Sequence, residues 1–227
     1  MRYKIVGNNL QLAICEINPG ERMYSEAGSM NHMSGNMKME AQAKGGLGGG
    51  LKRKLMGESF FVSTFEPMGG PGLVAFGGNV PGTIKPVVLD GSRTYFFQKT
   101  AFLAAQEGVA LEIAFQKKLG TGFFGGEGFI LQKLTGVGTC FIHACGDFVE
   151  MDLAPGQVMK IETGSVVGWE GNVQFNIERS GSIKTSLFAG EGFFLTTLTG
   201  PGHIILQSMN LQSLAMALAP FMPRQGN

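Results

Sequence analysis

The residues most suggestive of chemistry lie between Lys44 and Lys54, where five glycines in six positions precede a basic cluster, Lys52, Arg53 and Lys54. A Walker phosphate loop requires GxxxxGK followed by Ser or Thr, because the lysine and the hydroxyl reach phosphate and magnesium. Here Leu51 follows the last glycine, Lys52 comes one place late, and Arg53 follows that lysine where the hydroxyl belongs. The spacing favours a lengthened surface connection over a nucleotide site, and it makes the basic cluster a possible partner surface.

Three glutamates recur at one position of a repeated GE pair, namely Glu58, Glu127 and Glu191. If the three copies surround a common axis, these carboxylates converge and offer ligands to a hard cation such as calcium. Such a cation takes six to eight oxygen ligands, and no acidic cluster accompanies the glutamates. The alternative is that each carboxylate accepts backbone N–H groups at the start of its strand, and the sequence favours this structural role.

The stretch from Cys140 to Cys145, CFIHAC, contains two thiols and one imidazole. On a strand, Cys140 points to one face while His143 and Cys145 point to the other, so at most two ligands converge, whereas structural zinc takes four. A buried thiol beside a half-exposed histidine is the expected arrangement. No His-x-His pair and no activated serine is evident either, so the sequence predicts no catalytic residue, no metal and no cofactor, and it disfavours an enzyme.

Composition indicates a glycine-rich all-β protein. The 227 residues are 44% hydrophobic and include 36 glycines, which separate apolar runs as tight turns do. The 18 basic residues nearly balance 17 acidic ones, so no general attraction to nucleic acid is expected. The first residues lack the pattern of a signal peptide, and no apolar run is long enough to span a membrane, so we expect a soluble cytoplasmic protein.

An internal repeat organises the chain. Pro19-Gly20, Gly28-Ser29 and Gly35-Asn36 recur with unchanged spacing from Pro155 to Asn172, and each series precedes an alternating strand. A weaker copy starts at Asp90-Gly91. Three GE landmarks, GESFFVSTF, GEGFILQKL and GEGFFLTTL, occur in the same order.

The repeat predicts three units within one domain, at about residues 10–81, 82–145 and 146–210. Each unit is too small to bury both faces of a sheet, so we expect three β-sandwich repeats packed with pseudo-threefold symmetry. Apolar residues at helical spacing, namely Leu211, Leu214, Leu218 and Phe221, predict a short amphipathic helix over 211–222. This helix is expected to cap an open sheet edge or to dock on a second subunit.

The chain resembles the bacterial members of the altered-inheritance-of-mitochondria protein family over residues 1–222. The resemblance rests on GGLGGGLKRKLMGESFF, the repeated GEGF strand starts and the PGxxxxxxxGS segments. It implies a triplicated β-sandwich whose fold is similar to that of the tryptophan RNA-binding attenuation protein. It implies little chemistry, because the bacterial members have no established activity. The link of eukaryotic members to mitochondrial organisation is not carried over, because no mitochondrial presequence is visible.

These observations favour a non-catalytic binding or scaffold protein that forms homo-oligomers. Thirteen methionines, the aromatic pairs Phe123-Phe124 and Leu187-Phe188, and the terminal helix suggest a protein or membrane-surface partner. RNA binding by fold analogy is one alternative, although the near-neutral charge argues against nucleic acid. A small-molecule enzyme with a pocket between repeats is the other.

Overall fold

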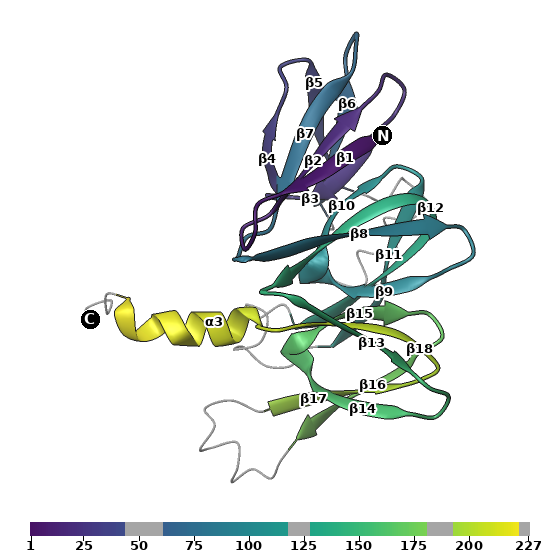
Figure 1. The fold of residues 1–227 in the computed structure, drawn as a ribbon, viewed down its shortest axis with the longest axis vertical. Helices are drawn as coiled ribbons and strands as arrows, with labels where there is room; N and C mark the ends of the chain where they lie inside the picture. The colour runs from purple at the N-terminus through teal and green to yellow at the C-terminus, as the bar shows by residue number, and fades with distance from the viewer. Residues whose placement is uncertain (44–60, 118–127, 181–192, 223–227) are drawn as a thin grey trace. The chain divides into compact units, whose positions relative to one another are not determined.

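The computed structural model describes residues 1–43, 61–117, 128–180 and 193–222, and these residues are predominantly β-strand (Figure 1). Packing divides the chain into two compact units. The first comprises Met1–Asp90, Phe102–Val109 and Gly136–His143, and the second comprises Gly91–Ala101, Ala110–Thr135 and Ala144–Asn227.

The first unit contains two groups of paired strands. One is the antiparallel sheet β1-β2-β7-β4, formed by β1 (Arg2–Val6), β2 (Leu12–Ile17), β7 (Gly72–Gly77) and β4 (Met30–Met33). The other has the order β5-β6-β3-β10-β12, with β5 (Met37–Ala43), β6 (Phe61–Pro67), β3 (Met23–Glu26), β10 (Phe102–Gln106) and the second half of β12 (Phe129–Cys145). β8 (Gly82–Asp90) pairs with β12.

One hydrophobic cluster joins both groups of strands in this unit. In β2, burial alternates residue by residue, and the inward positions Ala13, Cys15 and Ile17 are fully buried. They pack in the same cluster as Phe65 of β6 and Phe141 of β12. The period of two that the sequence shows therefore places one face of each strand in a shared core.

The second unit is built in the same way. The strands β13 (Phe148–Leu153), β18 (Gly202–Gln207), β15 (Val166–Glu170), β9 (Tyr95–Gln98) and the first half of β12 are neighbours in that order. A second sheet has the order β14-β17-β16, with β14 (Val158–Glu162), β17 (Phe193–Thr199) and β16 (Gln174–Ser180). Further elements are β11 (Val109–Lys117), which pairs with β12, and the 3-10 turns η1 (Lys99–Ala101) and η3 (Thr163–Ser165). Trp169 is fully buried in this unit's core.

The alternating strands expected in the three repeats are present as β5, β11 and β16. Each pairs with the strand that follows its GE landmark, namely β6, β12 and β17 respectively. The glycine turns after the second and third landmarks also share a backbone conformation, because Gly138 and Gly202 both have φ near +145°. The middle repeat contributes strands to both compact units. The three-repeat division and its threefold arrangement stay predictions.

The predicted C-terminal helix is confirmed. α3 spans Leu211–Leu218, and the 3-10 turn η4 (Ala219–Phe221) continues it. Across the part of the chain that the structure describes, no helix is long and apolar enough to cross a membrane.

Candidate functional site

The residues that the sequence singled out for binding lie outside the described ranges. They are the basic cluster Lys52, Arg53 and Lys54, the repeated carboxylates Glu58, Glu127 and Glu191, and the loop residues Phe123, Phe124, Leu187 and Phe188. Both interpretations of the glutamates therefore stay open, and the basic cluster stays a predicted partner surface.

β12 contains the CFIHAC stretch, and one expectation about it was wrong. His143 is buried, with 6% of its surface exposed, rather than half-exposed. The imidazole packs directly against Gly78, where a Cβ would overlap the ring. Burial lowers the pKa of His143, and a hydrogen bond with the backbone of Val80 opposes that shift only partly. The ring is therefore neutral near pH 7.

The two thiols of this stretch, and that of Cys15 in β2, are in environments that disfavour the reactive thiolate form. Cys15, Cys140 and Cys145 are buried and form no disulfide. Burial raises the pKa of the Cys140 thiol, and it raises that of Cys15 to about 12, so both remain protonated at neutral pH. Within the described ranges, no group of three or more His, Cys, Asp or Glu side chains is arranged to hold a metal ion.

A histidine flanked by two carboxylates lies on the strand pair β13 and β18. His203 Nδ1 lies 2.8 Å from Asp152 Oδ1, and its Nε2 lies 2.9 Å from Glu150 Oε2. Asp152 is the direct register partner of His203, and Glu150 is two residues away on the same face. Both ring nitrogens can donate only when the imidazole is protonated. Partial burial opposes that charge, but the hydrogen bonds to Glu150 and Asp152 outweigh it and raise the pKa of His203.

The surroundings of His203 favour a structural role. The backbone N–H of His203 is 3.4 Å from Glu170, and this carboxylate also forms an ion pair with Arg93 at 3.2 Å. Because its two nitrogens point to different carboxylates, His203 does not converge with them on a single ligand position. The spacing Glu150-x-Asp152 on a strand was the available sequence signal, and our sequence analysis did not use it.

The start of α3 is firmly anchored to the second unit. Asn210 caps the helix, since its Oδ1 accepts a hydrogen bond from the Ser213 N–H at 2.8 Å. Its Nδ2 donates to Glu162 Oε1 at 3.0 Å, and Gly164 packs against the same side chain. Asn210 is only 4% exposed. A buried cap therefore fixes where the helix begins.

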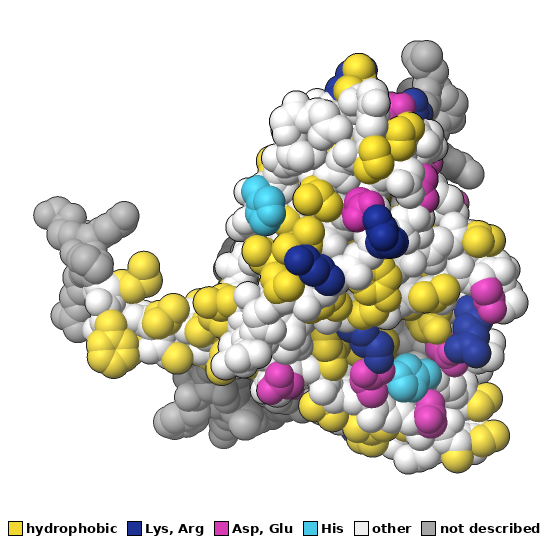
Figure 2. Space-filling model, turned by 45° about the horizontal axis from the view of Figure 1, so that its top comes forward, with side chains coloured by type: hydrophobic (Ala, Val, Ile, Leu, Met, Phe, Trp, Pro, Cys, Tyr) yellow, Lys and Arg dark blue, Asp and Glu magenta, His cyan; other side chains and the backbone are white. Residues whose placement is uncertain are grey.

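Beyond this anchor, the α3–η4 surface is apolar and exposed. We define it as residues 211–222, none of which is buried. Its exposed large hydrophobic side chains are Leu211 (49%), Met216 (60%), Leu218 (52%), Phe221 (86%) and Met222 (66%). No acidic or basic residue occurs between Ile204 and Met222. In Figure 2 this segment shows hydrophobic side chains and none that are charged.

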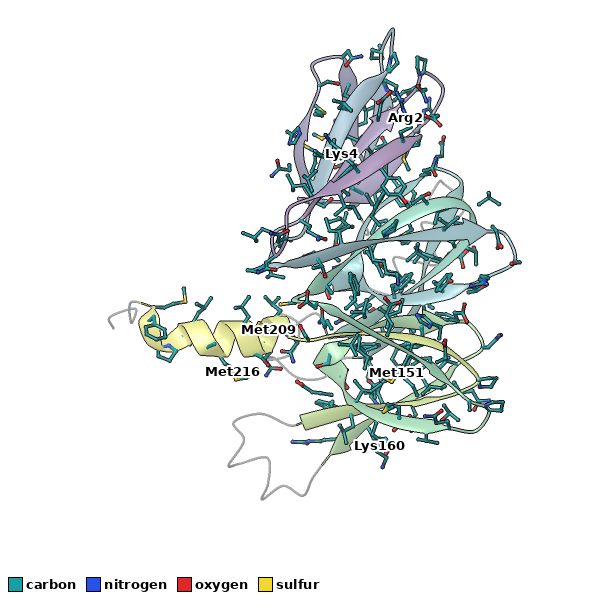
Figure 3. The ribbon with its side chains drawn as sticks, in the orientation of Figure 1. Arg2, Lys4, Met151, Lys160, Met209 and Met216 are labelled. Atoms are coloured by element: carbon teal, nitrogen blue, oxygen red, sulfur yellow. The ribbon has the colours of Figure 1, made fainter. Side chains whose placement is uncertain are left out.

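Apolar side chains occur on more than one side of this helix. Leu211, Leu214 and Leu218 follow the spacing of one stripe. Met216 lies two residues after Leu214, about 200° further around the helix. Figure 3 labels Met216 within α3 and Met209 just before it. No residue of α3 or η4 is buried, so within the described ranges the helix buries no apolar face against a sheet edge.

Comparison with known proteins gives similarity over nearly the whole chain. The family model described as mitochondrial biogenesis AIM24 matches residues 3–209, a range that ends just before the cap of α3. An uncharacterized protein of Streptococcus pyogenes serotype M6 is 31% identical over 237 residues, covering 100% of this chain and 93% of that protein. A crystal structure of a Streptococcus pyogenes protein matches with a TM-score of 0.79 at 26% identity, covering 97% of this chain and 99% of the other.

Proposed function

The chain belongs to the mitochondrial biogenesis AIM24 family, and from that premise we propose that it is a non-catalytic binding or scaffold protein that associates with a second copy of itself through the α3–η4 surface. Membership confirms the resemblance predicted from the sequence. It supplies no reaction, since the Streptococcus pyogenes serotype M6 relative is itself uncharacterized. The proposal therefore depends on the chain's own surface.

The observation that supports the proposal is an exposed helix without a charged face. A helix on the surface of a globular protein has a polar side, whereas one that is apolar on several sides is buried. In α3, only Gln212 and Ser213 are polar, and they occupy adjacent positions near its start. Leu218 and Phe221 are large apolar side chains that remain more than half exposed.

Helix energetics also indicate a missing contact. Isolated helices shorter than about 12 residues are marginal in water, because few hydrogen bonds repay the cost of nucleation. α3 has eight residues. The Asn210 cap contributes about 1 kcal/mol, which is small beside the contribution that tertiary packing makes to most protein helices. Burial of the apolar surface by a partner supplies the remaining stabilisation.

Symmetry and charge favour a second copy as that partner. In a two-fold dimer the same patch on both subunits forms the interface, so an apolar helix on one copy meets an equivalent helix on the other. A membrane-surface helix instead has Lys or Arg residues on a polar face. The α3–η4 surface has none. These features favour self-association over lipid binding.

Light scattering on the full chain tests the proposal with a matched pair of variants. Leu218→Lys places a charge on the α3–η4 surface, where Leu218 is 52% exposed. Val88→Lys places the same charge at a 66% exposed position on β8. We expect the parent and Val88→Lys to have a mass above that of the 24.2 kDa monomer, and Leu218→Lys to be monomeric. A monomeric parent, or equal masses for the two variants, contradicts the proposal.

A further inference from the structure

A pocket of about 450 Å³ lies within the first compact unit. Its walls come from residues 10–12 at the start of β2, residues 28–31 at the start of β4, residues 77–80 after β7, and His143 of β12. The volume is in the range of sites that take small molecules. Nothing in the self-association described above uses this pocket.

The walls are held in place by hydrogen bonds within the unit. The Gly77 N–H donates to the Ser29 carbonyl at 2.9 Å, and the Ser29 hydroxyl donates to the Glu26 carbonyl at 2.8 Å. Gln11 Oε1 accepts a hydrogen bond from the Ile84 N–H at 2.7 Å. Because these polar groups brace the walls, the pocket is preformed.

Two asparagines contribute amide groups to the lining. Asn31 lies at a β-bulge, because the pairing of β4 with β7 shifts register between Met30 and His32. A bulge turns a side chain out of the regular alternation of a strand. Asn79 is exposed in the segment after β7, and no described residue forms a hydrogen bond with its amide. Asn31 Oδ1 lies within hydrogen-bond distance of His32 Nδ1, at 2.9 Å, so Asn31 offers a ligand the donors of its Nδ2. The Asn79 amide offers both a donor and an acceptor.

His143 adds a neutral acceptor to the same lining. The neutral imidazole has one N–H, and its bond with the Val80 backbone uses that donor. The second ring nitrogen is therefore unprotonated. Gly78 is the residue that lets the ring lie in this position, since any side chain there would displace it.

Among the described residues of the lining there is no Asp, Glu, Lys or Arg, and His143 is neutral. Leu10, Leu12 and Met30 contribute apolar surface beside the amides and the imidazole. An ionised ligand would lose part of its hydration here without gaining a counter-charge from the described lining, which disfavours its binding. An uncharged molecule with hydrogen-bonding groups loses much less, because amides replace its bonds to water.

We propose that this pocket binds an uncharged small molecule that carries amide or hydroxyl groups together with an apolar portion. Asn79 donates and accepts hydrogen bonds with the polar groups, and Asn31 Nδ2 donates to them. Leu10, Leu12 and Met30 contact the apolar part. His143 accepts one further hydrogen bond from the ligand. The arrangement provides binding without a nucleophile or a titratable carboxylate in the lining.

NMR titration of the full chain with matched probes tests this assignment. The amide pair is N-acetylalanine methylamide and the ionised N-acetylalanine, and the hydroxyl pair is N-acetylglucosamine and its 6-phosphate. We expect at least one uncharged probe to shift the signals of Gly78, Asn79 and His143, and its charged counterpart to leave them unchanged. A response to N-acetylalanine methylamide shows that amide groups suffice for binding, whereas a response to N-acetylglucosamine alone shows that hydroxyl groups are required.

Variants make the test specific to the pocket. Asn79→Ala removes one hydrogen-bonding amide at an exposed position, so we expect about tenfold weaker binding of the responding probe. Gly78→Ala displaces the His143 ring and should weaken the same probe. Asn172→Ala, an exposed asparagine of the second unit, should have no effect. The proposal is overturned if no uncharged probe shifts these signals, if a charged probe shifts them equally, or if Asn79→Ala and Asn172→Ala bind alike.

Discussion

Replacement of Phe221 is the most informative perturbation of the α3–η4 surface. Phe221 is 86% exposed in the single chain, the largest value among the large hydrophobic residues of this surface. Full burial of a phenylalanine contributes about 1.5–3 kcal/mol, so covering Phe221 contributes about 2 kcal/mol per copy. A two-fold dimer forms this contact twice. Phe221→Ala therefore weakens the dimer by about 4 kcal/mol, or roughly a thousandfold in the dissociation constant.

Sedimentation equilibrium over a range of concentrations measures this constant directly. Met68→Ala is the matched control, because Met68 is 58% exposed in the turn after β6, within the first unit. We expect Met68→Ala to self-associate like the parent. The free energy of unfolding of the Phe221→Ala monomer should be unchanged, because η4 buries no residue. Equal dissociation constants for the parent and Phe221→Ala would refute the reasoning.

Three further substitutions test contacts within the second unit. Because its carboxylate partners raise the pKa of His203, its stabilisation of the fold is complete below about pH 6.5 and is lost as pH rises through the folded-state pKa. The difference in unfolding free energy between the parent and His203→Gln should therefore shrink over that range in urea titrations. Asn210→Ala removes the helix cap, and circular dichroism should detect loss of helix, with a cost of about 1 kcal/mol. A Cβ at Gly168 would overlap the Phe97 ring, so Gly168→Ala should lower the free energy of unfolding, measured by urea titration, by about 1–3 kcal/mol. Gly35 has open space around it, so Gly35→Ala should leave the free energy of unfolding unchanged.

Local patterns predicted the strands well. Alternation over residues 37–42 and 109–115 indicated strands, and these are β5 and β11. The helical spacing after Asn210 likewise predicted α3. Each of these elements follows from residues close together in the sequence, which is why periodicity was sufficient.

The order of the strands within the sheets could not be predicted from local sequence patterns. β7 pairs with both β2 and β4, and these pairs join residues far apart in the chain. β12 runs unbroken for 17 residues through the glycines that separate two strands in the other repeats. Strand pairing depends on which side chains fill a shared core, and a single repeat does not contain that information.

The candidate sites show the same limit. Burial of His143 depends on Gly78, which lies 65 positions earlier in the numbering of the chain. The flanking of His203 by Asp152 depends on the register between β13 and β18. The sequence did predict the apolar stripe of the terminal helix, and its exposure became visible only in the folded chain.

Distance measurement between copies tests self-association through α3 most directly. Ser213→Cys places a single accessible thiol on the polar side of the helix, since Cys15, Cys140 and Cys145 are buried. With a spin label at this thiol, double electron–electron resonance measures the distance between the labels of two subunits. We predict a narrow distance distribution that disappears when labelled protein is mixed with an excess of unlabelled protein. An absence of dipolar coupling at concentrations where the parent is oligomeric would contradict the claim that α3 forms the interface.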